Sequence, residues 1–233
     1  MWRANGLKMK DLISVIIPSY NGEKYIKECI ESIQAQDFDH EIIVIDDIST
    51  DSTVQIARQM GARVLVNDVH KGQVAGKNTG IREAKGNYWL TIDQDDLLTK
   101  GALSRLVEEM KKSPDNYIIM AQLKDFCSPD TPDQQKFVKP NPFYGILTGS
   151  TLFKTEVFDK IGFWQEGVIT GDVIDLTNRL QKTNIQIKKI EFVSCDRRIH
   201  NANYGRTNQK NEYKDYAKFL RERIKRENIE KPI

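Results

Sequence analysis

The sequence predicts an α/β domain with a mixed, mainly parallel sheet flanked by helices. Between residues 12 and 112, short apolar segments alternate with helical ones, as in successive βαβ units. The apolar segments are nearly continuous, which is typical of strands covered on both faces. A length of 233 residues suits one domain with a substantial core.

The expected elements of this first half alternate regularly. Helices at 23–36 and 99–112 are indicated by apolar residues that recur at helical spacing. Asp51 is expected to cap a helix that runs to about Met60. The whole series consists of strand 12–17, helix 23–36, strand 41–47, the helix after Asp51, strand 62–67, helix 73–84, strand 86–93 and helix 99–112.

The second half has a less regular pattern. Residues 125–142 carry four prolines in 18 residues and predict a long loop. A strand is expected within 144–154, a helix over 170–182 and a strand over 185–193. A last helical stripe over 209–226 is basic and amphipathic, with seven basic residues against three acidic.

The overall composition excludes several classes of protein. The chain has 35 basic and 33 acidic residues, a net charge of +2, so nothing indicates nucleic-acid binding or disorder. No run of 18 apolar residues predicts a membrane span. The first ten residues lack the apolar core of a signal peptide and are expected to form a leader. Three widely spaced cysteines indicate reduced thiols in a cytosolic protein, without a zinc site.

Polar residues gather where three of the predicted strands end. These are residues 18–21, Asp46 with Asp47, and the cluster Asp93, Asp95 and Asp96. The carboxyl ends of parallel strands share one rim of the sheet, where ligands bind. Residues two apart on an extended chain point the same way. Asp93 and Asp95 could therefore hold Mg²⁺ or Mn²⁺ together.

Each of these groups also has a purely structural interpretation. Asp96 or Thr99 could cap the following helix while the other carboxylates stay solvated. Asp47 at the end of its strand could accept a hydrogen bond from a ribose hydroxyl or a base N–H. Alternatively, Asp47 and Ser49 could serve only the local turn.

Four motifs together resemble a known family. They are "SVIIPSYN" (14–21), "EIIVIDDISTDST" (41–53), "HKGQVAGKNTGIREAKGNYWLTIDQDD" (70–96) and "RRIHN" (197–201). In order and spacing they resemble the inverting nucleotide-sugar glycosyltransferases of family two, over roughly residues 12–204. The resemblance implies the GT-A fold and transfer of one sugar from a nucleotide diphosphate donor, most often UDP-linked. It also implies Mn²⁺ or Mg²⁺ as cofactor and bacterial surface polysaccharide synthesis as the usual setting.

The resemblance also implies a nucleotide site. Pro18, Tyr20 and Glu23 would surround the base and ribose, with Tyr20 stacking on the base. Asp47 would hydrogen-bond the nucleobase. Tyr20 could instead be an aromatic residue of the rim.

Further residues match the family's diphosphate and metal positions. Lys77 and Asn78 stand in "AGKN", where many relatives have "ARN", so the positive charge is kept and the bidentate guanidinium is lost. Asp93 and Asp95 match the DxD pair, and Asp95 is the expected direct metal ligand. Asp96 can approach the metal or the ribose in some relatives.

A late "RxH" element matches positions near the diphosphate. Arg198 would lie beside the diphosphate, and His200 could complete the metal shell. Alternatively, His200 could be an ordinary loop histidine, and Arg198 could be a solvated charge without a specific partner.

The match loosens at the catalytic base. Relatives often carry "GED" before a helix, whereas this chain has "GDVIDLTNRL". Asp172 falls on the glutamate position and Val173 on the position of the usual base. Asp172 is therefore the candidate base, with Asp175 one turn further on and a helix N-cap as the structural alternative.

The motifs suggest a division of the chain. Residues 1–10 are the leader, 11–115 the nucleotide-sugar-binding half, 116–205 the acceptor-binding and catalytic half, and 206–233 the basic C-terminal helix. A basic amphipathic helix can lie on an anionic membrane, which would suit a lipid-linked acceptor, and otherwise packs on its own domain or on a partner. The expected partners are a nucleotide-sugar donor and a saccharide or lipid-linked acceptor, in the cytoplasm or at the inner face of the membrane.

Three rival functions remain. A haloacid-dehalogenase-type phosphatase would need D-x-D-x-T after the first strand, and Leu97 stands where the threonine would fall. A nucleotidyltransferase would carry a Gly-rich basic loop where this chain has "PSYNGEK". A catalytically poor sugar-nucleotide-binding protein is favoured by Val173 at the base position.

Overall fold

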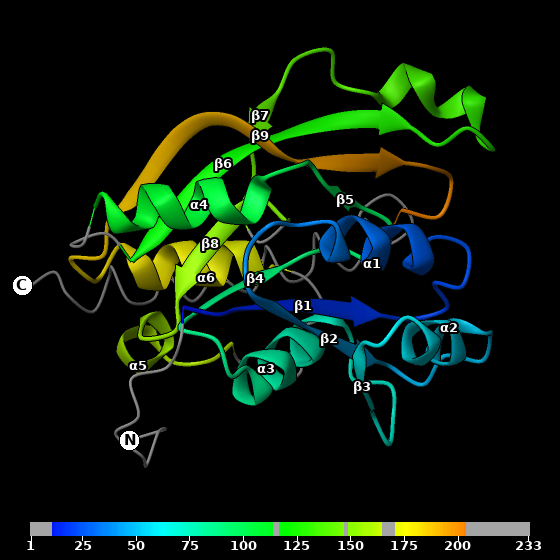
Figure 1. The fold of residues 1–233 in the computed structure, drawn as a ribbon, viewed down its shortest axis with the longest axis horizontal. Coiled ribbons are helices and arrows are strands. Elements are labelled where there is room, and N and C mark those ends of the chain that lie inside the picture. Colours follow the sequence, from blue (N-terminus) through cyan, green and yellow to red (C-terminus); the bar gives the residue numbers. More distant parts are fainter. Residues whose placement is uncertain (1–10, 114–116, 147–148, 165–170, 204–233) are drawn as a thin grey trace, which may run out of the picture.

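The computed structural model describes residues 11–113, 117–146, 149–164 and 171–203. Strands in this part of the chain form one nine-stranded sheet (Figure 1). The strands are β1 (Ile13–Ser19), β2 (His40–Asp46), β3 (Arg63–Val66), β4 (Tyr88–Thr91), β5 (Leu97–Leu98), β6 (Ile118–Cys127), β7 (Phe143–Tyr144), β8 (Thr151–Lys154) and β9 (Ile187–Ile199). The helices are α1 (Ile26–Gln34), α2 (Thr53–Gln59), α3 (Gln73–Glu83), α4 (Ala102–Lys111), α5 (Val157–Ile161), α6 (Asp172–Leu180) and the 3₁₀ helix η1 (Pro132–Phe137).

The sheet is mixed, and most of its strands run in one direction. The order is β3-β2-β1-β4-β8-β6-β9-β5, with β7 also paired to β6. β1 pairs in parallel with β2 and β4, β2 with β3, and β6 with β9. β8 is antiparallel to both β4 and β6, while β5 and β7 run against β9 and β6. This arrangement confirms the mixed α/β class and aligns the carboxyl ends of β1, β2, β4, β6 and β9.

Helices cover both faces of the sheet. Side chains alternate along β1, so that Val15 and Ile17 pack toward α1, α2 and α4, whereas Ile16 packs toward α3, α5 and α6. All three side chains are fully buried. In Figure 1, α1 and α4 lie on one side of the sheet, with α3 and α5 on the other. Two apolar cores therefore hold the strand ends in fixed positions.

The predicted elements of the first half are all present, with shifts of a few residues at their ends. The predicted cap at Asp51 is displaced by one residue, because Ser52 occupies the N-cap position of α2, while Asp51 accepts the backbone N–H of Thr53 at 3.0 Å. The loop predicted over 125–142 is partly wrong, because β6 continues to Cys127 and η1 occupies part of it. The last predicted strand is longer than expected and runs on to Ile199.

Two predicted segments, the leader at 1–10 and the helix within 206–233, lie outside the described residues. None of the helices in the described ranges combines the length and the apolar character needed to cross a membrane.

Candidate functional site

A cleft of about 1080 Å³ opens at the carboxyl ends of the strands. It brings together ten of the twelve predicted site residues, which come from separate parts of the chain. These are Pro18, Tyr20, Asp47, Lys77, Asp93, Asp95, Asp96, Asp172, Arg198 and His200. The rim predicted from the strand ends therefore exists as one connected space.

Asp93 is the first carboxylate of the aspartate turn, which we define as residues 93–96. Burial raises the pKa of Asp93 to about 6; Lys77 opposes the shift, and Asp95 adds to it. Its Oδ1 accepts a hydrogen bond from Gln73 Nε2 at 3.1 Å. A carboxylate in this environment gains from any positive charge placed beside it.

Asp96 is buried beneath the turn, with 1% of its surface exposed. Its Oδ1 accepts the backbone N–H of Arg198 at 2.9 Å, and its Oδ2 has no hydrogen-bond partner. Burial raises the pKa of Asp96 well above its ordinary value, and Asp95 and Asp93 add to the shift. The alternative role as a helix cap is wrong, because α4 begins after Gly101 and no side chain caps it.

Asp95 is held by the segment that follows β9. Its Oδ2 lies 2.7 Å from His200 Nε2 and 3.2 Å from Asn203 Nδ2. His200 Nδ1 accepts the backbone N–H of Ala202 at 3.2 Å. A neutral imidazole carries one proton, so the proton lies on Nε2 and is donated to Asp95.

Gln94, the middle residue of the motif, fixes the loop after β1. Its Oε1 accepts the backbone N–H of Tyr20 at 3.1 Å, and its Nε2 donates to the Tyr20 carbonyl at 3.0 Å. The ring of Tyr20 is 47% exposed and lies edge-on to His70, with centroids 4.9 Å apart. The aspartate turn and the predicted base-stacking residue are thus joined directly.

Asp47 is occupied by the loop that leads into α3. Its Oδ1 accepts from Asn67 Nδ2 and Lys71 N, each at 2.8 Å, and its Oδ2 accepts from Gly72 N at 2.8 Å and lies 2.9 Å from His70 Nδ1. Burial opposes ionisation, yet these hydrogen bonds hold the pKa of Asp47 below its usual range. A nucleobase N–H would therefore share this carboxylate with the loop.

Lys77 and Asp172 form an ion pair in the lining of the cleft. Lys77 Nζ lies 2.6 Å from Asp172 Oδ2, and the two side chains are 4% and 14% exposed. Asp172 is the first residue of α6, and Gly171 precedes it at the N-cap position with a positive φ of 83°. The N-cap alternative for Asp172 is therefore wrong, and its carboxylate points to the α3 lysine. Asp175 instead pairs with Arg179 at 2.8 Å.

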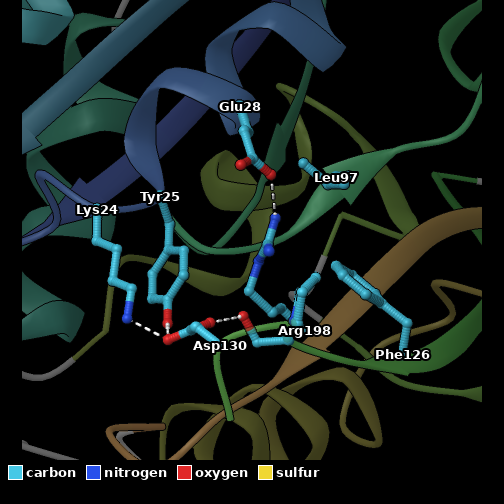
Figure 2. Close-up of a pocket in the computed structure, with 9 residues that line it drawn as sticks. Lys24, Tyr25, Glu28, Leu97, Phe126, Asp130 and Arg198 are labelled. Atoms are coloured by element: carbon cyan, nitrogen blue, oxygen red, sulfur yellow. Dashed lines mark hydrogen bonds and ion pairs between the residues drawn. The ribbon is translucent and has the colours of Figure 1, made fainter. Parts of the chain in front are cut away.

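Arg198 points toward Glu28 of α1, in a hollow beside the cleft (Figure 2). Its guanidinium lies between the rings of Tyr25 and Phe126, at 4.9 and 4.8 Å from their centroids. It donates to Glu28 at 2.6 Å and, through Nε, to the carbonyl of Asp95 at 2.9 Å. Arg198 thus supports the aspartate turn from a neighbouring hollow of about 320 Å³.

Two predicted residues do not line the cleft. Asn78 is 1% exposed, and its side chain bonds the backbone of Trp164 in both directions, at 2.9 and 3.1 Å. Glu23 accepts the backbone N–H of Ser52 at 3.0 Å, at the start of α2. Both residues tie loops together.

The donor set of the turn fits a hard divalent cation. The carboxylates of Asp93 and Asp95 face the cleft together with His200, and one oxygen of Asp96 lacks a partner. No group of three such side chains within the described ranges already has ligating geometry. Cation binding through Oδ2 of Asp95 would replace the hydrogen bond that this oxygen accepts from His200.

Comparison with known proteins decides the family. The family model described as Glycosyl transferase family 2 matches residues 14–165. The chain belongs to this family. That membership agrees with the resemblance of the motifs and displaces the phosphatase and nucleotidyltransferase alternatives.

The chain is similar to several bacterial glycosyltransferases. The glycosyltransferase GlyG of Streptococcus pneumoniae serotype 4 is 30% identical over 182 residues, covering 66% of the chain and 60% of GlyG. A poly(ribitol-phosphate) beta-glucosyltransferase of Bacillus spizizenii is 33% identical over 150 residues, covering 60% of the chain and 23% of that protein. The chain thus spans less than two thirds of the length of both relatives.

Solved structures confirm the GT-A fold. The structure of S. aureus TarS 1–349 in complex with UDP-GlcNAc matches with a TM-score of 0.66 at 20% identity, covering 82% of this chain and 60% of that one. A mannosyltransferase from Pyrobaculum calidifontis in complex with GDP-Man and Mn²⁺ matches with a TM-score of 0.63 at 18% identity, covering 84% and 59%.

Sequence reasoning missed several residues of the cleft. Arg197, His70, Gln73 and Gln94 all line it. Arg197 stands beside a predicted residue, and Gln94 lies inside the DxD motif. Their position within or beside a motif was the only feature of the sequence that could have identified these residues. The direction in which each side chain points depends on the folded backbone.

Proposed function

We propose that this family 2 glycosyltransferase transfers a sugar from a nucleotide diphosphate-sugar, UDP-linked, to a hydroxyl of a saccharide or lipid-linked acceptor. Transfer proceeds with inversion, is assisted by Mn²⁺ or Mg²⁺, and serves cell-surface polysaccharide synthesis at the cytoplasmic side of the membrane. One observation carries the proposal: a single cleft joins the aspartate turn, the Tyr20–Asp47 side and the Lys77–Asp172 pair. The complexes of structural neighbours with UDP-GlcNAc and GDP-Man support it.

The residues divide the donor between them. Tyr20 offers an exposed ring for the base, and Asp47 offers an ionised carboxylate beside it. The aspartate turn lies next, where the diphosphate would be placed. A divalent cation held by Asp95 and Asp93, with His200 as a further ligand, would neutralise charge on the leaving diphosphate.

Asp172 acts as general base in this proposal. The acceptor oxygen attacks the anomeric carbon and forms the new C–O bond while the bond to the diphosphate breaks and its electron pair leaves with the nucleoside diphosphate. The acceptor proton passes to the Asp172 carboxylate. Lys77 Nζ lies 2.6 Å from the same carboxylate and orients it.

The first test is release of nucleoside diphosphate from a panel of nucleotide sugars, with and without Mn²⁺. We expect slow donor hydrolysis by the wild type with one donor class and its loss in Asp95→Ala. Thermal shift with UDP or GDP, with and without Mn²⁺, measures binding separately. A chain that responds to neither nucleotide with metal would contradict the donor site.

Asp172→Asn tests the base. Because a general base contributes about 10²–10⁴-fold, turnover should fall by that factor while donor affinity is kept. Asp175→Asn is the matched control, since Asp175 pairs with Arg179 outside the cleft lining. Unchanged turnover in Asp172→Asn would remove this residue from the mechanism.

The second candidate is a sugar-nucleotide-binding protein with poor catalysis. It is favoured by Val173 at the base position and by the engagement of Asp172 with Lys77. Donor binding without measurable nucleotide release from any donor, in the presence of Mn²⁺ and acceptor extracts, would favour this candidate.

A further inference from the structure

Two consecutive arginines at the end of β9 face different surroundings. Arg198 enters the hollow beside α1, where it is 3% exposed and bonded to Glu28. The side chain of Arg197 is 33% exposed and lines the main cleft. Figure 2 shows the Arg198 side chain directed toward Glu28 in the neighbouring hollow. Strand alternation accounts for this division.

Arg197 is held in a fixed orientation. Its Nε and Nη2 donate to the two carboxylate oxygens of Asp125 at 2.8 and 3.0 Å. Asp125 is 4% exposed and also accepts the backbone N–H of Lys139 at 3.1 Å. The guanidinium lies 5.1 Å from the centroid of Phe143, whose ring also carries Lys139 Nζ at 3.7 Å.

The charge of Arg197 acts on the aspartate turn. Burial raises the pKa of Asp93 and of Asp96, and the positive charge of Arg197 counters the rise at both. Within the described part of the chain, Nη1 of Arg197 makes no hydrogen bond. A guanidinium that binds one carboxylate through Nε and Nη2 keeps the N–H groups of Nη1 for a second anion.

We propose that Arg197 binds a phosphate oxygen of the donor's diphosphate, and that Arg198 only positions the aspartate turn from behind. This inference rests on the proposed function, because it assigns a ligand contact within the same cleft. Bidentate pairing with Asp125 pre-orients the guanidinium of Arg197. Phosphate binding would therefore cost little side-chain conformational entropy.

The test compares Arg197→Gln with the wild type in binding uridine, UMP and UDP, and in parallel guanosine, GMP and GDP, by calorimetry in EDTA. Loss of a hydrogen bond to a charged group should weaken diphosphate binding about 10- to 100-fold while nucleoside binding stays unchanged. Arg197→Lys should fall between the two, because one ammonium cannot serve Asp125 and a phosphate with the same geometry. Lys139→Gln is the matched control, since it removes a cation from the same ring outside the cleft lining.

The outcomes separate the two proposals. A wild type that binds neither diphosphate, in EDTA or after addition of Mn²⁺, contradicts the proposed function itself. A wild type that binds UDP or GDP, with an unchanged diphosphate-to-nucleoside affinity ratio in Arg197→Gln, overturns only the role of Arg197. Should Arg197→Gln fail to fold, the same ratio in Arg197→Lys decides, because a merely structural role would weaken nucleoside and diphosphate binding equally.

Discussion

At the scale of single residues, the aspartate turn stores electrostatic strain. The pKa of Asp93 is raised to about 6, so the folded state holds a proton that the unfolded chain releases near its ordinary value of 3.8. The folded state therefore binds more protons between these values, and stability decreases as pH rises through that window. Below about pH 4 the penalty is absent, and above about pH 6 it is complete.

We accordingly expect Asp93→Asn to be more stable than the wild type at pH 7 in EDTA. The shift corresponds to at most about 3 kcal/mol, since each pKa unit is worth about 1.4 kcal/mol. The advantage should vanish near pH 4, and urea unfolding at both pH values measures it. Asp196→Asn is a comparison outside the turn, on a half-exposed carboxylate. Equal stability of Asp93→Asn and wild type at pH 7 would refute the buried charge.

Most of the predicted site residues lie in the cleft, but sequence reasoning could not assign what each one touches. Asp47 follows a predicted strand in the sequence. Only the fold shows that its carboxylate oxygens accept hydrogen bonds from residues 67–72. Asn78 belongs to a family motif, and its partner Trp164 is 86 residues away. Contacts of this kind depend on packing between distant segments, which local pattern does not encode.

At the scale of elements, the position of Asp172 at the start of α6 depends on the glycine that precedes it. Gly171 has φ 83°, a left-handed conformation in which a side chain is strained. The same holds for Gly61 at the end of α2, with φ 78° and open space around it. The two glycines differ in that Gly171 adjoins the candidate base and lines the cleft.

Gly171→Ala should lower the free energy of unfolding by about 1–2 kcal/mol. It should also reduce turnover at least several-fold while leaving UDP affinity intact, because it disturbs Asp172 and not the nucleotide side. Gly61→Ala should cost similar stability without a kinetic effect, and denaturant titration with steady-state kinetics compares them. Equal turnover in the two variants would show that the geometry of α6 does not limit the reaction.

The regular elements were predictable and the irregular ones were not. Helices such as α1 and α4 repeat apolar residues at helical spacing, so their pattern is complete within the local sequence. Strand β5 has two residues and α5 has five, which is too short for any period to show. β6 was missed because its far end, Asp125–Cys127, pairs with β9 some seventy residues later and merges into a proline-rich segment.

At the scale of the molecule, one sheet joins the two predicted halves. The connection is made by β4 and β8, where Trp89 stacks on Phe153 with ring centroids 4.1 Å apart and an interplanar angle of 2°. Both side chains are fully buried. The apolar contacts of the sheet therefore run across the predicted boundary near residue 115.

A fragment of residues 11–113 should consequently fail to fold as a monomer. It would expose Trp89 and leave β4 as an open edge of the sheet. We expect self-association in gel filtration and no cooperative thermal transition, against a single transition for the whole chain under the same conditions. A monomeric fragment with a sharp transition would show that the nucleotide half is an autonomous domain.

The proton position on His200 links the far end of β9 to ligand capture. Nδ1 accepts the amide of Ala202, so the ring can offer Nε2 as a lone pair only by taking a proton at Nδ1. Two N–H groups would then face each other, and the peptide before Ala202 would have to turn. Binding of a ligand at Nε2 of His200 would thus change the environment of the Ala202 amide, two residues away. The 200–203 turn would adopt one backbone conformation for each tautomer of the His200 ring.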